Sequence, residues 1–149
     1  MENEINYIIH TDGGYSQKYN IGAFAFIICD KNDKEIKRGA WKIENETNNR
    51  AELKAIIAAL YNLPSDAKNV IVISDSQYAL YTCSGAWKRK SNKDLFVIHD
   101  NIVKKRGLNV SYEWVKGHNG DYFNELCDKL CNDAAGFDLN EEYRKYSKR

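Results

Sequence analysis

The chain has 149 residues, of which 43% are hydrophobic and 29% charged, so it is a globular domain rather than a disordered chain, a coiled coil or a fibre. Its formal net charge is only +1, which excludes a polycation and leaves any attraction to polyanions to local clusters of lysine and arginine. The sequence has no signal-peptide pattern and no stretch near the roughly 18 apolar residues of a membrane span, so we expect a cytoplasmic protein without membrane contact.

The first half of the chain predicts three strands and one helix. Residues 5–12, 21–29 and 35–43 are apolar and separated by short turn segments, which favours an antiparallel meander. A helical composition then follows the capping residues at 47–49, and we expect that helix to end at Pro64.

The second half alternates strands with helices. Residues 70–73 form a β-branched run that is typical of a strand buried on both faces, and a second strand is predicted at residues 109–115. Helices are predicted at residues 77–83, 94–106 and 121–135.

The resulting order, βββαβααβα, predicts an α/β fold. We expect a five-stranded mixed sheet, an antiparallel meander followed by parallel strands, with helices on both faces. Residues 1–136 should form one domain, and residues 137–149 a charged C-terminal tail that is partly disordered.

The four cysteines, Cys29, Cys83, Cys127 and Cys131, are scattered through the chain. Without a secretion signal they should be reduced thiols in the core. A zinc site formed by Cys127, Cys131 and His118 is an alternative, but no Cys-x-x-Cys pair accompanies them, and core packing is favoured.

Four acidic residues stand at related places in the predicted fold. Asp12 and Asp75 each end a predicted strand, Glu52 lies in the first turns of the intervening helix, and Asp128 lies on the last helix. Taken singly, Asp75 is equally well explained as a helix cap, and Glu52 as a first-turn glutamate that complements the helix dipole. Their shared placement where strands end and helices begin favours one site.

Carboxylates gathered so closely repel one another unless cations lie between them. Oxygen-rich sites with room for water suit Mg²⁺ or Mn²⁺. Two such ions, about 4 Å apart, activate a water and stabilise the leaving oxygen of an in-line displacement, which predicts hydrolysis of phosphodiester bonds in a nucleic acid.

Five segments resemble ribonuclease HI in both order and spacing, and the resemblance extends over roughly residues 5–136. The segments are residues 11–13 (TDG), 47–53 (TNNRAEL), 74–78 (SDSQY), 114–120 (WVKGHNG) and 124–128 (NELCD). The second and fourth are far more specific than any single acidic residue.

The resemblance implies a metal-dependent endonuclease that hydrolyses the RNA strand of RNA–DNA hybrids. It implies that Asp12, Glu52, Asp75 and Asp128 bind two Mg²⁺ ions, for which Mn²⁺ can substitute. His118, in a glycine-flanked loop, would assist proton transfer or product departure, and its ordinary pKa near 6.5 suits that task. The alternative for His118 is an ordinary surface-loop histidine.

The resemblance also implies contacts with the hybrid. Asn48, Asn49 and Gln77 match positions that touch the minor groove, where amides contact base edges and 2′-hydroxyls. Capping and turn formation are their alternative explanation. The full set expected to contact substrate is Gly13, Thr47, Asn48, Asn49, Gln77, Trp87 and Asn92, with Thr47 and Asn92 at positions that hold a phosphate of the DNA strand.

Two segments depart from the family pattern. The hairpin at residues 15–20 is short, which puts a minor-groove contact in doubt, and Asn20 is a weak substitute for it. Residues 86–91 are too few for the basic protrusion of many bacterial members. Trp87 and the three basic residues after it are expected to form a reduced grip, unless the ring is core and the cations are merely exposed. Affinity should then be modest and fall with salt.

Two other functions stay open. One is a non-catalytic module that binds hybrids or double-stranded RNA, which is disfavoured because all four carboxylates and the histidine are present. The other is a ribonuclease H domain derived from a retroelement. The initial methionine and the tail favour a free-standing protein, which we expect to be a monomer.

Overall fold

The structure is a computed structural model that describes residues 4–117 and 119–141. Its five strands form one sheet in the spatial order β3-β2-β1-β4-β5. They are β1 (Tyr7–Ser16), β2 (Ile21–Asp30), β3 (Glu35–Glu44), β4 (Asn69–Ser74) and β5 (Asn109–Trp114). The first three strands pair antiparallel, whereas β4 runs parallel to both β1 and β5, so the predicted mixed sheet is confirmed.

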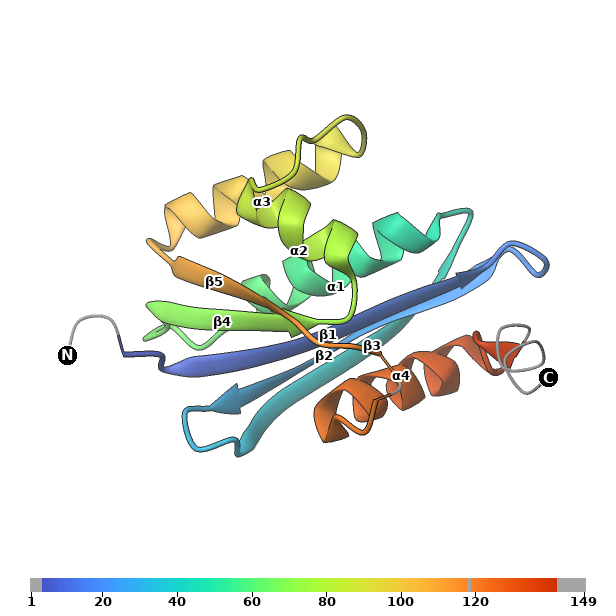
Figure 1. The fold of residues 1–149 in the computed structure, drawn as a ribbon, viewed down its shortest axis with the longest axis horizontal. Coiled ribbons are helices and arrows are strands. Elements are labelled where there is room, and N and C mark those ends of the chain that lie inside the picture. Colours follow the sequence, from blue (N-terminus) through green and yellow to red (C-terminus); the bar gives the residue numbers. More distant parts are fainter. Residues whose placement is uncertain (1–3, 118, 142–149) are drawn as a thin grey trace.

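Four helices cover the two faces of this sheet. They are α1 (Asn48–Tyr61), α2 (Gln77–Ser84), α3 (Lys93–Lys105) and α4 (Tyr122–Ala135). Figure 1 shows α1, α2 and α3 on one side and α4 alone on the other. In the part of the chain that the structure describes, no helix has the length and apolarity to cross a lipid bilayer.

Alternating strand residues build a core on each face. On the side of α1, the buried Ile9 and Val72 pack with Leu53 in the larger cluster. On the side of α4, the buried Ile27 and Cys29 pack with Cys127. Successive side chains of a strand point to opposite faces, which is why β1 contributes to the cores on both sides of the sheet.

All four cysteines are free and buried, as core packing requires. Burial raises the pKa of the Cys83 thiol to about 12, so this side chain stays protonated near neutral pH and is a poor metal ligand.

The first strand is longer than the sequence predicts. Its parallel pairing with β4 stops at His10 opposite Ile73, but its antiparallel pairing with β2 continues to Ser16 opposite Ile21. The expectation that β1 ends at Asp12 is therefore wrong, because the hairpin with β2 extends the strand past that residue. Asp12 lies where the parallel partner ends.

Candidate metal centre

The two halves of the sheet bring Asp12 and Asp75 together. Beyond the last parallel pair, β4 ends at Ser74 and the chain turns toward α2, while β1 continues past Asp12. The cap of α2 is Ser76, whose hydroxyl accepts a hydrogen bond from the Ala79 N–H at 3.1 Å. The alternative role of Asp75 as the helix cap is therefore not needed.

Glu52 reaches the same place because α1 crosses very close to β1. A Cβ atom added at Gly13 would lie 2.6 Å from the carbonyl carbon of Ala51 and from the backbone nitrogen of Glu52. Only glycine allows this approach. Gly13 therefore has a structural role, in addition to the substrate contact predicted for it.

Three of the four predicted carboxylates form one cluster. Asp12, Glu52 and Asp75 each offer a carboxylate oxygen, and these oxygens lie within 4.8 Å of one another. Asp128, on α4, is not a member of that cluster but lines the same cavity of about 330 Å³. Asp12 lies on β1, Glu52 in the first turns of α1, Asp75 directly after β4, and Asp128 on α4 at the opposite face of the sheet.

The electrostatics of this cluster favour a cation. Burial, followed by the charges of Glu52, Asp75 and Asp128, raises the pKa of Asp12 well above its usual range, against the opposing hydrogen bond from the Gly13 N–H. Burial and then Asp75 likewise raise the pKa of Glu52. The raised pKa values mean that nearby protein groups do not offset the cost of burying these negative charges side by side, and a bound cation would do so.

One buried oxygen is also left without a partner. Among the described residues, the Oε1 atom of Glu52 has no hydrogen-bond donor although it is shielded from solvent. A buried polar atom of this kind costs free energy unless a ligand or water satisfies it. A set of oxygen donors with an unsatisfied member fits a divalent cation such as Mg²⁺ or Mn²⁺.

The end of β5 and the loop that follows it contact Asp75. The indole N–H of Trp114 donates to the carbonyl of Asp75 at 3.0 Å. A Cβ atom at Gly117 would lie 2.6 Å from the Oδ2 atom of Asp75. His118, predicted to assist proton transfer, lies outside the described residues, and its neighbour Gly117 is next to the carboxylates.

The predicted minor-groove residues lie at the starts of α1 and α2. Asn48 lines the carboxylate cavity, whereas Asn49 and Gln77 are exposed and do not line it. The N-cap of α1 is Thr47, whose hydroxyl accepts from the Arg50 N–H at 3.1 Å. Asn48 is therefore not the cap, and the hydrogen of the Thr47 hydroxyl is not used in this contact.

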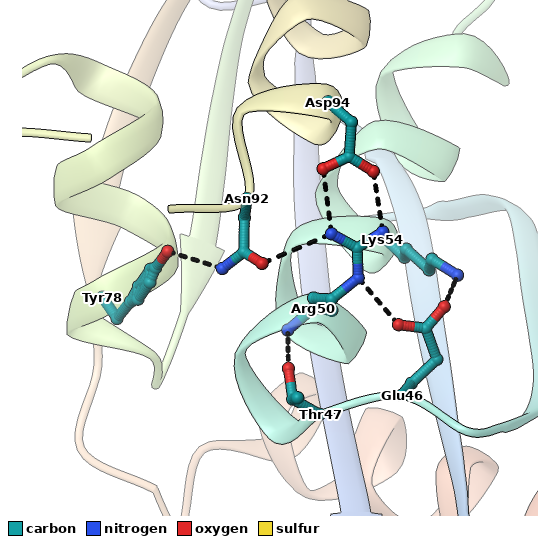
Figure 2. A network of polar contacts seen from close by, with 7 residues as sticks. All are labelled: Glu46, Thr47, Arg50, Lys54, Tyr78, Asn92 and Asp94. Carbon is teal, nitrogen blue, oxygen red and sulfur yellow. Dashed lines mark hydrogen bonds and ion pairs between the residues drawn. The ribbon is translucent and has the colours of Figure 1, made fainter. Parts of the chain in front are cut away.

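Asn92 is held in a polar network between α1, α2 and α3 (Figure 2). Its amide donates to the Tyr78 hydroxyl at 2.9 Å and accepts from an Arg50 Nη1–H at 3.3 Å. Arg50 also makes a bidentate pair with Asp94, at 2.9 and 2.8 Å, and donates to Glu46 at 2.8 Å. Sequence reasoning assigned no role to Arg50, although it lies within the TNNRAEL segment.

The basic segment after α2 divides into two kinds of residue. The Trp87 side chain is 47% exposed, so the alternative in which it belongs to the core is wrong. Lys88 and Lys90 are exposed and line a surface groove with it. Arg89 instead donates to the carbonyls of Thr82 and Cys83, pairs with Asp100 and stacks on Phe96, so it is structural.

The hairpin side chain proposed as a weak substitute contact is already engaged. Asn20 is hydrogen-bonded to Tyr15 on its own hairpin and to Asn45 ahead of α1. Two residues that the sequence did not single out, Leu139 and Asn140, line the carboxylate cavity. Neither belongs to a motif, and no sequence signal marked them.

Comparison with known sequences identifies a family over most of the chain. A family model described as RNase H matches residues 4–136. Ribonuclease H of Mannheimia succiniciproducens is 35% identical over 141 residues, covering 85% of this chain and 85% of the relative. Ribonuclease H of Treponema denticola is 32% identical over 158 residues, covering 88% of this chain and 98% of the relative.

Solved structures show the same fold. LC11-RNase H1, solved in complex with an RNA/DNA hybrid, is similar with a TM-score of 0.76 and 26% identity, covering 87% of this chain and 96% of that one. The N-terminal RNase H domain of a Mycobacterium tuberculosis protein has a TM-score of 0.77 and 25% identity, covering 89% of this chain and 95% of that one.

Proposed function

This chain belongs to the RNase H family, and we propose that it is an endonuclease that hydrolyses the RNA strand of RNA–DNA hybrids with two Mg²⁺ ions. The observation that carries this proposal is the cluster of the buried Asp12 and Glu52 with the half-buried Asp75, whose carboxylate oxygens lie within 4.8 Å of one another. Asp128, which lines the same cavity, completes the proposed ligand set.

Divalent ions held by these carboxylates would supply Lewis acidity, lowering the pKa of an attacking water and stabilising the departing oxygen. Asp12, Glu52 and Asp128 lie on β1, α1 and α4, and Asp75 directly follows β4, so regular elements hold the backbone of the four carboxylates in place before substrate arrives. His118 would carry a proton to or from the reacting phosphate, since histidine titrates near neutral pH.

The hybrid would lie along the edge where α1, α2 and α3 begin. Asn48 lines the carboxylate cavity, so its amide is well placed to contact a 2′-hydroxyl near the scissile phosphate. Thr47 and Asn92 would hold a phosphate of the DNA strand, while Trp87 would pack on a sugar or base farther along. A hybrid substrate is supported by LC11-RNase H1, whose structure includes an RNA/DNA hybrid.

We also infer that the protein acts as a cytoplasmic monomer. A single chain supplies all four carboxylates that line the cavity, so the site needs no second subunit. The four free, buried cysteines suit a reducing compartment. Sedimentation velocity at assay concentration checks the oligomeric state.

The direct test is cleavage of a labelled RNA–DNA hybrid by the purified protein with Mg²⁺ or Mn²⁺, with and without chelator. Matched RNA–RNA, DNA–DNA and single-stranded RNA substrates are the controls. We expect products only from the hybrid and only with metal. Binding of the hybrid without metal-dependent products would instead support the non-catalytic module.

Two variants test the assignment of the ligands. Asp12→Asn and Asp75→Asn should each abolish hybrid cleavage, because each removes a charge from the proposed ligand set. Circular dichroism should show an unchanged fold. Cleavage at the wild-type rate by either variant would contradict the proposed metal site.

A further inference from the structure

The chain turns back toward the carboxylates after α4. Helix α4 ends at Ala135 and is capped by Gly136, which has a left-handed φ of 90° that favours glycine. The Gly136 N–H donates to the Asn132 carbonyl at 2.9 Å. The residues that follow, 137–141, lie beyond the segment matched by the family model. We call residues 137–141 the return segment.

The return segment is anchored by several contacts. The Leu139 N–H donates to the side-chain oxygen of Asn132 at 2.9 Å, and the Leu139 side chain packs with the core under α4. A Cβ atom at Gly14 would lie 3.2 Å from a methyl carbon of Leu139, so β1 and this segment are in close contact. The Phe137 ring meets Tyr19 edge-on with centroids 5.1 Å apart.

These anchors set the position of Asn140. Its backbone N–H donates to the Asp138 carboxylate at 2.9 Å, which forms a local turn. Its side-chain amide then donates to the Oδ1 atom of Asp128 at 2.7 Å. Both side chains are half-buried and line the cavity that contains Asp12, Glu52 and Asp75.

We propose that Asn140 is a positioning residue that holds the Asp128 carboxylate in the orientation needed to bind a divalent ion. Asp128 is the proposed ligand that stands outside the close cluster, so the orientation of its carboxylate decides whether that group faces the other three. The hydrogen bond from the anchored Asn140 amide favours one orientation of this carboxylate over the others. This inference rests on the proposed function.

The physical basis is the general behaviour of outer-shell groups in metal sites. Ligating carboxylates are themselves hydrogen-bonded, and loss of such a partner costs about 10–100-fold in metal affinity. Asn140 carries no charge, so its removal changes the orientation of Asp128 without changing the net charge of the cavity. An effect on metal affinity would therefore come through Asp128.

The test is calorimetric titration of Mn²⁺ into the protein without nucleic acid. Asn140→Ala should weaken Mn²⁺ binding about 10-fold, near the lower end expected for an outer-shell partner. Asn62→Ala is the matched control, because Asn62 also donates one side-chain hydrogen bond, to the Ala58 carbonyl at 2.8 Å, at the far end of α1. That variant should bind Mn²⁺ as the wild type does.

A double-mutant cycle separates positioning from a general structural effect. Asp128→Asn should itself weaken Mn²⁺ binding, and adding Asn140→Ala to Asp128→Asn should cause no further loss. Wild-type affinity in Asn140→Ala, or the same loss with Asp128→Asn already present, would overturn the proposal. Wild-type affinity in Asp128→Asn would also overturn it, because Asp128 would then hold no ion.

Cleavage assays keep this inference distinct from the proposed function. If the wild type cleaves hybrids, Asn140→Ala should need about 10-fold more metal for half-maximal rate and regain most of its activity at saturating metal. If the wild type cleaves nothing, the proposed function fails, and the titrations still decide whether Asn140 acts through Asp128.

Discussion

The proposed chemistry requires a charged carboxylate at Asp12, but burying that charge lowers the stability of the metal-free protein. Its carboxyl group is buried beside Glu52 and Asp75, and burial followed by these charges raises its pKa. In the folded protein without metal, Asp12 therefore retains a proton at pH values where the unfolded chain, with an ordinary pKa near 4, has lost it. The folded state binds more protons, so the free energy of unfolding falls as pH rises from about 4 through the raised pKa.

We therefore predict that Asp12→Asn stabilises the metal-free protein at pH 7, because the amide carries no charge to desolvate or repel. A gain on the order of 1 kcal/mol would raise Tm by roughly 2–4 °C in a domain of this size. Urea unfolding in chelator from pH 4.5 to 8 should show a smaller decline with pH for the variant than for the wild type.

Divalent metal provides the control for this prediction. Saturating Mn²⁺ should stabilise the wild type more than Asp12→Asn, since a ligand that binds only the folded state raises its stability. A variant that is less stable than the wild type in chelator would show that the Asp12 carboxylate is not under electrostatic strain.

At the scale of elements, Arg50 joins the starts of α1 and α3 and thereby sets the position of Asn92 (Figure 2). Asn92 adopts a left-handed conformation, with φ of 59°, and its side chain does not cap α3. Its orientation depends instead on Tyr78 and Arg50. The network therefore couples a proposed phosphate contact to three helices.

Tyr78→Phe tests this dependence by removing the Tyr78 hydroxyl, which accepts a hydrogen bond from the Asn92 amide. We predict a rise in KM of about 5-fold with little change in kcat, since a hydrogen bond contributes about 1 kcal/mol and Asn92 contributes to binding rather than to chemistry. Steady-state cleavage of a hybrid measures both constants. Tyr61→Phe, at an exposed tyrosine at the end of α1, should leave them unchanged, and a fall in kcat in Tyr78→Phe would contradict this role for Asn92.

The Arg50–Asp94 pair gives a second prediction with a defined pH dependence. The side-chain hydrogen bond from Arg50 lowers the pKa of Asp94 to about 2. The stabilising contribution of this carboxylate is present above the unfolded pKa near 4 and is lost as pH falls through about 2. Asp94→Asn should therefore be less stable than the wild type at pH 6, and the difference should shrink toward pH 2 in thermal unfolding.

The elements that the sequence predicted correctly have strong local signals. Residues 70–73 are continuously β-branched, and the helix that contains Glu52 begins at a capping threonine. The end of β1 was predicted wrongly because Gly13 and Gly14, which follow Asp12, have a low strand propensity, yet the hairpin with β2 continues the strand as far as Ser16 opposite Ile21. Here the pairing of the two strands overrides the propensity of the single residues.

The candidate site divides in the same way. The motifs predicted that Asp12, Glu52 and Asp75 lie together, as they do. The role proposed for Asn140 instead arises from a contact between the return segment and Asp128 on α4, which no motif marks. Arg89 was expected to be a cation for phosphates because it follows Trp87. In the structure, Arg89 instead donates hydrogen bonds to carbonyls at the end of α2. A run of basic residues in the sequence does not show which of its members makes such contacts.

At the scale of the whole molecule, 22 basic residues are balanced by 21 acidic ones, so hybrid affinity depends on where exposed cations gather locally. Lys88 and Lys90 border the groove beside Trp87, whereas Arg89 between them is engaged with backbone carbonyls and Asp100. Each phosphate contact contributes about 0.9 to the slope of log affinity against log salt on duplex DNA, and a hybrid should behave similarly. The three adjacent cations should therefore differ in their effect on that slope.

We predict that Lys88→Ala and Lys90→Ala each reduce the salt slope by roughly 0.9 with little change in Tm. Arg89→Ala should leave the slope nearly unchanged but lower Tm by several degrees, because it removes contacts with two carbonyls, Asp100 and Phe96. Fluorescence anisotropy of a labelled hybrid between 50 and 200 mM salt, in chelator to prevent cleavage, measures the slopes. A slope change in Arg89→Ala as large as in the lysine variants would mean that Arg89 leaves its contacts to bind phosphate, and unchanged slopes in both lysine variants would remove the groove beside Trp87 from the substrate path.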